Sequence, residues 1–468
     1  MVVGDFAHEK EVLIIGGGPG GYHAAIRAAQ LGKEVTLVEK QALGGICLNN
    51  GCISSKVFAE AAKRMRDAHD FPSFGMTFES FTFDINELQK HKATVINSLT
   101  KGVQALLKKH NVEVIQGTAT FLSDNQVGVE NGDSFEKYEF EQAVIATGSS
   151  YVRPKGFTLT HERILDPTSI YEQTECPDHL IVCGSDYQAI EVASSFSAFG
   201  TKITFALDGP LPYDETINKE LIRLFKKSKI KILKDAALKK VSPYEKHLEA
   251  TFRLGDQEQT ITASHIYLPD ERVANTKALR LEVCGIEVMN EGLITITETT
   301  QTNQPHIFAV GDVTAHGSLA VEAIKQGKVA GERIGGKKSV WDPWARPNVG
   351  YSIRPIATTG LTEEEALNEG YDIHIGEFPL ASNGYASIIN KKEGLFKIIS
   401  EKETDVILGC HLIGEGSVAF ISQAVQALEM GARMEDLTYP YYPHPSLNEA
   451  WLEASEALTG MAIHRTSS

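Results

Sequence analysis

One pattern occurs twice in the chain and constrains its fold more than any other feature: a strand, a glycine-containing turn, a helix and a second strand. The first copy runs through residues 11–40, with its helix expected at 24–31. The second runs through residues 180–207, with its helix expected at 189–199. Each copy is a βαβ unit of about 30 residues, the nucleotide-binding half of a doubly wound parallel sheet. The repetition predicts an α/β protein with two Rossmann-like nucleotide-binding domains.

The length of 468 residues exceeds what a single hydrophobic core usually organises. After residue 346 the pattern changes to α+β, with strands expected at 395–400 and 406–413 and a helix at 418–430. The sequence therefore predicts four regions, which are residues 1–149, 150–274, 275–345 and 346–468. The last of these is expected to be a C-terminal α+β domain.

The net charge of −16 disfavours nucleic acid and anionic membranes as partners. No apolar run approaches the roughly 20 residues that cross a bilayer. Residues 1–10 lack the basic, apolar and small-residue regions of a signal peptide. Six cysteines in a chain of this length do not form a disulfide scaffold. We expect a cytoplasmic protein that binds neither nucleic acid nor a membrane.

The first glycine-containing turn has the spacing of a dinucleotide-binding motif. Gly16 permits the tight turn, Gly18 lets the backbone approach a pyrophosphate, and Gly21 lets the helix pack closely. The free N–H groups at the start of the helix favour bound phosphates. Glu39 ends the second strand, 21 residues after Gly18, where a carboxylate hydrogen-bonds a ribose hydroxyl. The segment therefore predicts a bound dinucleotide.

Cys47 and Cys52 are the two cysteines that lie close together in sequence, and a glycine is near each of them. Two cysteines five residues apart near a helix start can bond to each other, and the helix N-terminus lowers the pKa of a thiolate. A strained, accessible disulfide of this kind exchanges with a substrate dithiol. Zinc is the alternative, but no second Cys or His pair lies at ligand spacing, so we expect no metal.

A histidine precedes a proline in the segment His444–Glu449, near the C-terminus. A histidine that titrates near neutrality suits proton transfer to and from a dithiol, and a carboxylate can fix its tautomer. On the residues alone, a His-Pro pair in a loop is unremarkable.

Together these segments resemble the pyridine nucleotide-disulfide oxidoreductases, and within them the dihydrolipoamide dehydrogenase branch, over essentially the whole chain. The matching segments are Gly16–Gly21, Glu39, Gly44–Lys56, the Thr147-Gly148 turn, the Ala309–Asp312 turn and His444–Glu449. The resemblance implies FAD, a homodimer, and four regions in chain order: FAD-binding, NAD-binding-like, central (completing the FAD site) and interface. It also implies dihydrolipoamide or a lipoylated protein domain as the substrate, in a 2-oxo acid dehydrogenase complex.

The resemblance implies roles for individual residues as well. Cys47 would exchange with the substrate dithiol, and Cys52 would be the thiolate that interacts with the flavin. Lys56 would lie near the flavin and pair with Glu191, while Asp312 would contact the ribityl chain. Further cofactor contacts are implied at Lys40, Gly45, Gly117, Thr147, Gly148 and Ala320.

By the same resemblance, His444 would be the acid/base and Glu449 its orienting partner. Family members supply this pair from the opposite subunit, so the site would require the dimer. The family usually has another histidine where this chain has Tyr442. Because the residue before the proline carries the chemistry, that change need not be damaging.

The second glycine-containing turn departs from the family pattern. It keeps Gly184 but has Asp186 where the backbone should approach a pyrophosphate. At about 4 Å and an effective dielectric near 20, like charges repel by roughly 4 kcal/mol before screening. Leu207 takes the position that Glu39 has in the first copy, and no arginine lies in residues 201–213 to bind a 2′-phosphate of NADP.

These departures leave two alternatives for NAD. Either NAD still binds, with Asp208 or a shifted loop compensating, or its binding is weak or lost. In the second case the enzyme would be an NAD-independent dithiol oxidase that passes electrons to oxygen, a quinone or a protein. A mercuric reductase is disfavoured because no cysteine pair follows Cys410. A non-catalytic subunit of a 2-oxo acid dehydrogenase complex is disfavoured because a scaffold would not require the complete redox set.

Overall fold

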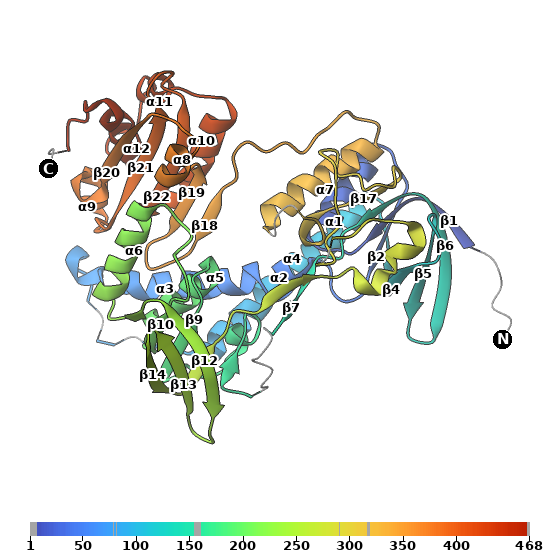
Figure 1. The fold of residues 1–468 in the computed structure, drawn as a ribbon, viewed down its shortest axis with the longest axis horizontal. Helices are drawn as coiled ribbons and strands as arrows, with labels where there is room; N and C mark the ends of the chain where they lie inside the picture. The colour runs from blue at the N-terminus through green and yellow to red at the C-terminus, as the bar shows by residue number, and fades with distance from the viewer. Residues whose placement is uncertain are drawn as a thin grey trace. The chain divides into compact units, whose positions relative to one another are not determined.

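The chain folds into two units, each assembled from three separate stretches of sequence (Figure 1). Unit 1 comprises Met1–Ser54, Glu87–Thr158 and Asp270–Asp342, and unit 2 comprises Ser55–Asn86, Leu159–Pro269 and Pro343–Ser468. This computed structural model describes residues 7–77, 79–80, 82–153, 161–289, 291–315 and 319–465. Within those ranges no helix is both long and apolar enough to span a membrane.

Unit 1 is built on a mixed seven-stranded sheet. Six strands follow the order β3-β2-β1-β6-β5-β4, and the seventh, β17, also pairs with β6. Its strands are β1 (Ala7–Ile15), β2 (Val35–Glu39), β3 (Glu113–Gln116), β4 (Thr118–Phe121), β5 (Gln126–Asn131), β6 (Ser134–Ile145) and β17 (Ile307–Ala309). The strands β17, β6, β1, β2 and β3 run parallel, whereas β4, β5 and β6 form an antiparallel meander. All four residues of Val12–Ile15 are buried, as expected of a parallel strand that is covered on both faces.

Helices α1 (Pro19–Gln30) and α7 (Ala320–Ile334) lie side by side in unit 1 (Figure 1). Their backbones approach so closely that a Cβ on Gly327 would lie 2.2 Å from the Gly20 carbonyl oxygen. Helix α2 (Gly45–Asn49) lies in unit 1. Helix α3 (Cys52–Ala68) begins in unit 1 and continues in unit 2, and α4 (Ile85–Lys109) belongs to unit 1 from Glu87 onward. A two-stranded ladder pairs β7 (Ser149–Val152) with β16 (Glu271–Ala274).

Unit 2 contains a parallel five-stranded sheet in the order β11-β10-β9-β15-β8. Its strands are β8 (Ile164–Leu165), β9 (His179–Cys183), β10 (Lys202–Ala206), β11 (Lys231–Leu233) and β15 (His265–Tyr267). Helices α5 (Tyr187–Ala198) and α6 (Glu215–Lys227) belong to the same region. An antiparallel sheet follows, formed by β12 (Ala236–Pro243), β13 (Leu248–Leu254) and β14 (Gln257–Ala263).

The C-terminal part of unit 2 is an antiparallel sheet in the order β18-β19-β22-β21-β20. Its strands are β18 (Asn348–Gly350), β19 (Ile356–Gly360), β20 (Ile373–Pro379), β21 (Gly394–Glu401) and β22 (Ile407–Gly414). The helices here are α8 (Glu363–Asn368), α9 (Gly384–Ile388), α10 (Ser417–Glu429), α11 (Met434–Thr438) and α12 (Asn448–Glu456). Phe378, Phe396 and Trp451 are buried together in the core of this α+β region.

The predicted α/β class, with two Rossmann-like βαβ units and a C-terminal α+β region, is confirmed. The first predicted helix was placed too late, at 24–31, because the glycines and Pro19 were assigned to the turn. In the structure Gly18 is the N-cap and Pro19 is the first helical residue. Proline is favoured there because the first helical N–H has no intrahelical acceptor in any case.

Candidate functional site

The first glycine-containing turn leaves one side of its backbone open. Gly16 has φ +106°, and a Cβ there would lie 2.4 Å from the Ala146 carbonyl oxygen. A Cβ on Gly21 would lie 1.9 Å from the Gly16 carbonyl oxygen, so both positions require glycine. At Gly18, in contrast, the nearest atom to a Cβ is 3.9 Å away. No side chain caps the start of α1. The turn therefore fits a bound diphosphate, which the open side at Gly18 can admit.

Glu39 ties the end of β2 to this turn. Its side chain is buried, and its two carboxylate oxygens accept hydrogen bonds from the N–H groups of Gly17 and Gln41, each at 2.7 Å. Lys40 follows it directly and is exposed. Glu39 is therefore held at the end of β2, beside the glycine-containing turn.

Two further predicted glycines lie in the same corner of unit 1. Gly45 starts α2, and a Cβ on it would lie 2.9 Å from the Gly18 Cα. Gly117 joins β3 to β4, and its N–H donates to the Glu39 carbonyl oxygen at 3.0 Å. Ala320 is the first residue of α7, the helix that packs on α1. These predicted cofactor residues therefore belong to elements that pack together within unit 1.

The Thr147-Gly148 turn after β6 is clamped by one asparagine. The Asn275 side-chain amide donates to the Thr147 carbonyl oxygen, and the Thr147 hydroxyl donates to the Asn275 carbonyl oxygen, both at 2.9 Å. The Asn275 N–H donates to the Gly148 carbonyl oxygen at 2.9 Å. This reciprocal clamp holds the turn in one conformation.

Asp312, beyond β17, takes part in a polar cluster that the sequence did not predict. Its Oδ2 accepts from the Ser149 hydroxyl at 2.6 Å and from Arg272 Nη1 at 3.0 Å. The Arg272 guanidinium also lies 5.3 Å from the ring centre of Tyr151. These partners come from the paired strands β7 and β16, so their proximity depends on a ladder between segments far apart in sequence.

The two cysteines occupy adjacent short elements. Cys47 lies within α2, Cys52 is the first residue of α3, and both are partly buried. The partial positive charge at the start of α3 favours the thiolate of Cys52. Lys56 is four residues further along α3 and therefore shares a helix face with Cys52. Burial, with Cys47 nearby, raises the pKa of Tyr22.

The ion pair expected between Lys56 and Glu191 is formed. Lys56 Nζ lies 2.9 Å and 3.1 Å from the two carboxylate oxygens. Glu191 is 1% exposed and also accepts from the Tyr351 N–H at 3.1 Å. The rings of Tyr187 and Tyr351 lie 5.7 Å and 5.2 Å from the ammonium. The lysine is therefore held by one carboxylate and two aromatic rings.

His444 and Glu449 also form the expected contact, at 2.5 Å between Nδ1 and Oε1. The Ser446 N–H donates to the other carboxylate oxygen at 2.8 Å. Burial alone would raise the pKa of Glu449, but the hydrogen bonds from His444 and the Ser446 N–H hold that pKa below its usual value. The His444 side chain is 83% exposed, so Nε2 can face a substrate or another subunit.

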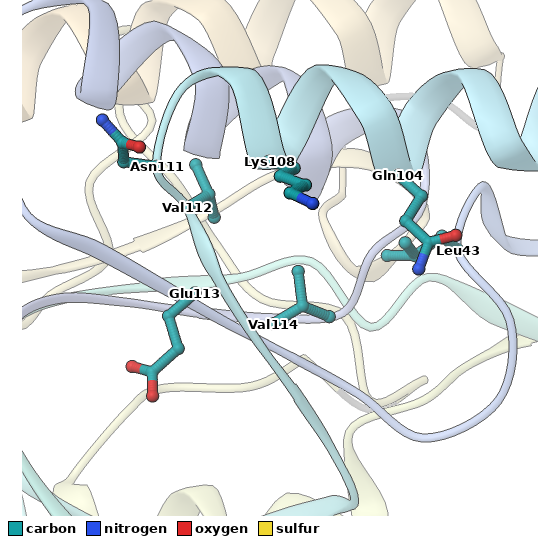
Figure 2. Close-up of a pocket in the computed structure, with 7 residues that line it drawn as sticks. All are labelled: Leu43, Gln104, Lys108, Asn111, Val112, Glu113 and Val114. Carbon is teal, nitrogen blue, oxygen red and sulfur yellow. The ribbon is translucent and has the colours of Figure 1, made fainter.

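A separate pocket of about 460 Å³ opens between the end of α4 and β3. Figure 2 shows the residues that line it, which are Leu43, Gln104, Lys108, Asn111, Val112, Glu113 and Val114. None of these is a predicted site residue. Across the described parts of the chain, no group of three or more His, Cys, Asp or Glu side chains is arranged to hold a metal ion.

Known proteins resemble this chain over nearly its whole length. Residues 10–327 match the family "Pyridine nucleotide-disulphide oxidoreductase", and residues 346–455 match the dimerisation domain of the same family. Proteins named dihydrolipoyl dehydrogenase from Geobacillus stearothermophilus and Bacillus subtilis are 39% and 38% identical to this chain, with 99% of each chain covered. The crystal structure of LpdA from Mycobacterium tuberculosis superimposes with a TM-score of 0.89 at 23% identity, covering 96% of this chain and 99% of that one.

Proposed function

Because the chain belongs to the pyridine nucleotide-disulphide oxidoreductase family and is an FAD-dependent disulfide oxidoreductase, we propose that it oxidises a dihydrolipoyl dithiol through Cys47 and Cys52. The observation that carries this proposal is that Cys47 lies in α2, whose first residue Gly45 adjoins Gly18 of the open turn, and that Cys52 is the first residue of the next helix, α3. The full-length relatives named dihydrolipoyl dehydrogenase support the choice of dithiol.

Residues of unit 1 would hold the diphosphate and the ribose of the cofactor. Gly16, Gly18 and Gly21 shape the turn that admits the diphosphate, and Glu39 is placed for a ribose hydroxyl. Asp312 is assigned to the ribityl chain. The remaining contacts are assigned to Lys40, Gly45, Gly117, Thr147, Gly148 and Ala320, with Lys56 and its partner Glu191 near the flavin. FAD, when bound, supplies the acceptor for the electron pair that leaves the substrate dithiol.

Thiol–disulfide exchange accounts for the role of each cysteine. One substrate thiolate attacks the Cys47 sulfur, the Cys47–Cys52 bond breaks, and Cys52 leaves as a thiolate. The second substrate sulfur then attacks the first substrate sulfur, which is bonded to Cys47 in the mixed disulfide. The bond to Cys47 breaks, the substrate disulfide forms, and the Cys47 sulfur is released. Two electrons have moved from the substrate to the cysteine pair. The start of α3 stabilises the thiolate left on Cys52.

His444 accepts the proton of the attacking substrate thiol, and the proton of the second thiol passes to the Cys47 thiolate as it is released. The Glu449 carboxylate holds Nδ1, which leaves Nε2 as the atom that accepts a proton from a substrate thiol. The chain carries the dimerisation domain of its family, and the resemblance to that family implies that the opposite subunit supplies this pair. We therefore assign the complete site to the homodimer.

Four functional regions follow, with FAD binding in 1–149, a nucleotide-binding-like domain in 150–274, a central region in 275–345 and the interface domain in 346–468. We place the protein in the cytoplasm, where the thiols of Cys176, Cys183, Cys284 and Cys410 stay reduced. Its natural substrate would be a lipoylated domain of a 2-oxo acid dehydrogenase complex.

Anaerobic titration of the oxidised flavoprotein with dihydrolipoamide tests this function. We expect the flavin absorbance to fall and a long-wavelength thiolate-to-flavin band to appear. Cys47→Ser should abolish turnover while dimers still form, because serine does not exchange with a disulfide. If dihydrolipoamide leaves the wild-type flavin unchanged, or if Cys47→Ser retains turnover, the proposed function is wrong. A purely structural subunit would be indifferent to Cys47→Ser.

A further inference from the structure

The two glycine-containing turns of the chain start their helices with the same backbone but different side chains. The N-cap of α1 is Gly18, with φ −70° and ψ −177°. The N-cap of α5 is Asp186, with φ −77° and ψ 171°. No side chain caps α1, whereas the Asp186 carboxylate accepts a hydrogen bond from the Ala189 N–H at 2.8 Å. The difference between the two turns at this position is therefore the side chain alone.

That side chain occupies the place where the turn would hold a diphosphate. The start of a helix binds phosphate through its unpaired N–H groups and its partial positive charge. In α5 the Asp186 carboxylate already takes up an N–H of the first turn and brings its own negative charge there. An incoming diphosphate would have to displace one carboxylate hydrogen bond and would face a like charge.

The ribose position in the second βαβ unit is also unsuited to its ligand. In the first unit Glu39 presents a carboxylate at the end of β2. At the corresponding place after β10 stands Leu207, whose side chain is buried. The Leu207 N–H donates to the carbonyl oxygen of Leu233, the last residue of β11. The Leu207 carbonyl oxygen accepts from the N–H of Ala236, the first residue of β12. A buried leucine offers no acceptor to a ribose hydroxyl.

Asp208 does not replace the missing carboxylate. Successive side chains of an extended segment point to opposite sides, and Leu207 is buried while Asp208 is exposed. The backbone hydrogen bonds of Leu207 with Leu233 and Ala236 hold this register. Turning Asp208 inward would therefore require those bonds to break.

We infer that the second βαβ unit of this chain does not bind NAD(H), because Asp186 fills the phosphate position of the turn and Leu207 fills the ribose position. The residues present do not fit the nucleotide, although the fold of the unit does. This inference extends the proposed dithiol oxidation and concerns nucleotide binding only, so the two can fail separately.

The test compares NADH and dihydrolipoamide on the holoenzyme. NADH binding is measured by fluorescence, and reduction of the flavin is followed anaerobically with each reagent. The variants are Asp186→Gly, which copies the N-cap of α1, and Asp186→Asn, which keeps the cap but removes the charge. A third variant combines Asp186→Gly with Leu207→Glu to copy both features of the first unit.

We expect NADH to leave the wild-type flavin oxidised, and both single variants to bind NADH at least about tenfold more tightly, as relief of a like-charge contact allows. Dihydrolipoamide should reduce the flavin of all four proteins. Micromolar binding of NADH by the wild type would overturn the inference, as would single variants that bind NADH no more tightly than the wild type. Failure of the dihydrolipoamide arm would instead count against the proposed function.

Discussion

Glu191 is 1% exposed and holds the Lys56 ammonium between its two carboxylate oxygens, at 2.9 Å and 3.1 Å. The two residues are 135 positions apart in the chain and come from α5 and α3. The Tyr351 N–H donates to the same carboxylate. One buried carboxylate therefore joins three separate segments of unit 2.

Glu191→Gln should lower the stability of the protein by about 2 kcal/mol, or about 2 °C in the unfolding midpoint. The amide cannot balance the lysine charge, but Lys56 is 32% exposed, so the cost is smaller than for a fully buried pair. Thermal unfolding of the holoenzyme measures this change. Lys56→Met together with Glu191→Leu should recover part of the loss; an additive double variant would show that the two residues are not coupled.

Removing the imidazole of His444 should slow dithiol oxidation. His444→Gln is expected to lower kcat for dihydrolipoamide by about 10²- to 10⁴-fold, because it removes the proton acceptor. Glu449→Gln should cost less, since the amide still holds Nδ1 but no longer stabilises the imidazolium. Steady-state rates with dihydrolipoamide and an artificial electron acceptor, such as ferricyanide, measured across pH, report both effects.

The same helix provides a matched control for this prediction. Glu453, one turn along α12 from Glu449, contacts His464 Nδ1 at 2.5 Å, the same distance as in the first pair. His464→Gln should therefore change kcat by less than about twofold, as an exposed substitution outside the site. Equal losses in His444→Gln and His464→Gln would contradict the assignment of the acid/base to His444.

The sequence predicted the elements whose signals are local. Each βαβ unit was recognisable because an apolar strand, a glycine turn and an alanine-rich helix follow one another within about 30 residues. The pairs Lys56–Glu191 and His444–Glu449 were expected only from the resemblance to a known family. The start of α1 was misplaced because Gly18 and Pro19 suit a turn and a helix N-terminus equally well.

Contacts that depend on tertiary structure could not be predicted from the sequence. Asp312 meets Arg272 because β7 pairs with β16, and no pattern around either residue encodes that ladder. Lys397 is entirely buried against Asp214, 183 residues away, although a lysine on a strand is ordinarily taken as exposed. Such pairs become visible only when the packing is known.

The pair Lys397–Asp214 gives a prediction for stability against pH. Lys397 Nζ lies 2.9 Å and 3.1 Å from the Asp214 carboxylate and 2.6 Å from Glu363. Burial opposes ionisation of both partners, but the hydrogen bond from Lys397 lowers the pKa of Asp214, and the hydrogen bonds to Glu363 and Asp214 raise the pKa of Lys397. The pair is therefore ionised across the neutral range.

Because the folded pKa of Asp214 is depressed, its contribution to stability is fully present above the ordinary value of 3.8 and is lost as pH falls through the lower folded value. Lys397→Met should destabilise the protein by about 3 kcal/mol at pH 7, since it leaves a buried carboxylate without its partner. In acid that difference should shrink as Asp214 becomes protonated. Unfolding midpoints at pH 7 and pH 3 measure it; a constant difference would contradict the ion-pair account.

Gly18→Asp would give α1 the N-cap that α5 has, and it should weaken the binding of FAD. The backbone of Gly18 has φ −70°, which aspartate adopts readily at Asp186, and the nearest atom to a Cβ at Gly18 is 3.9 Å away. The variant should therefore fold. Its carboxylate would cap the first turn of α1 and repel the diphosphate, so we expect affinity for FAD to fall at least about tenfold.

Flavin content per chain after dialysis measures the effect, and circular dichroism verifies folding. The matched control is Gly18→Ala, which adds a Cβ without charge. Full flavin content in Gly18→Asp would mean that an aspartate at this position tolerates a dinucleotide, and the argument from Asp186 against NAD(H) would fail with it.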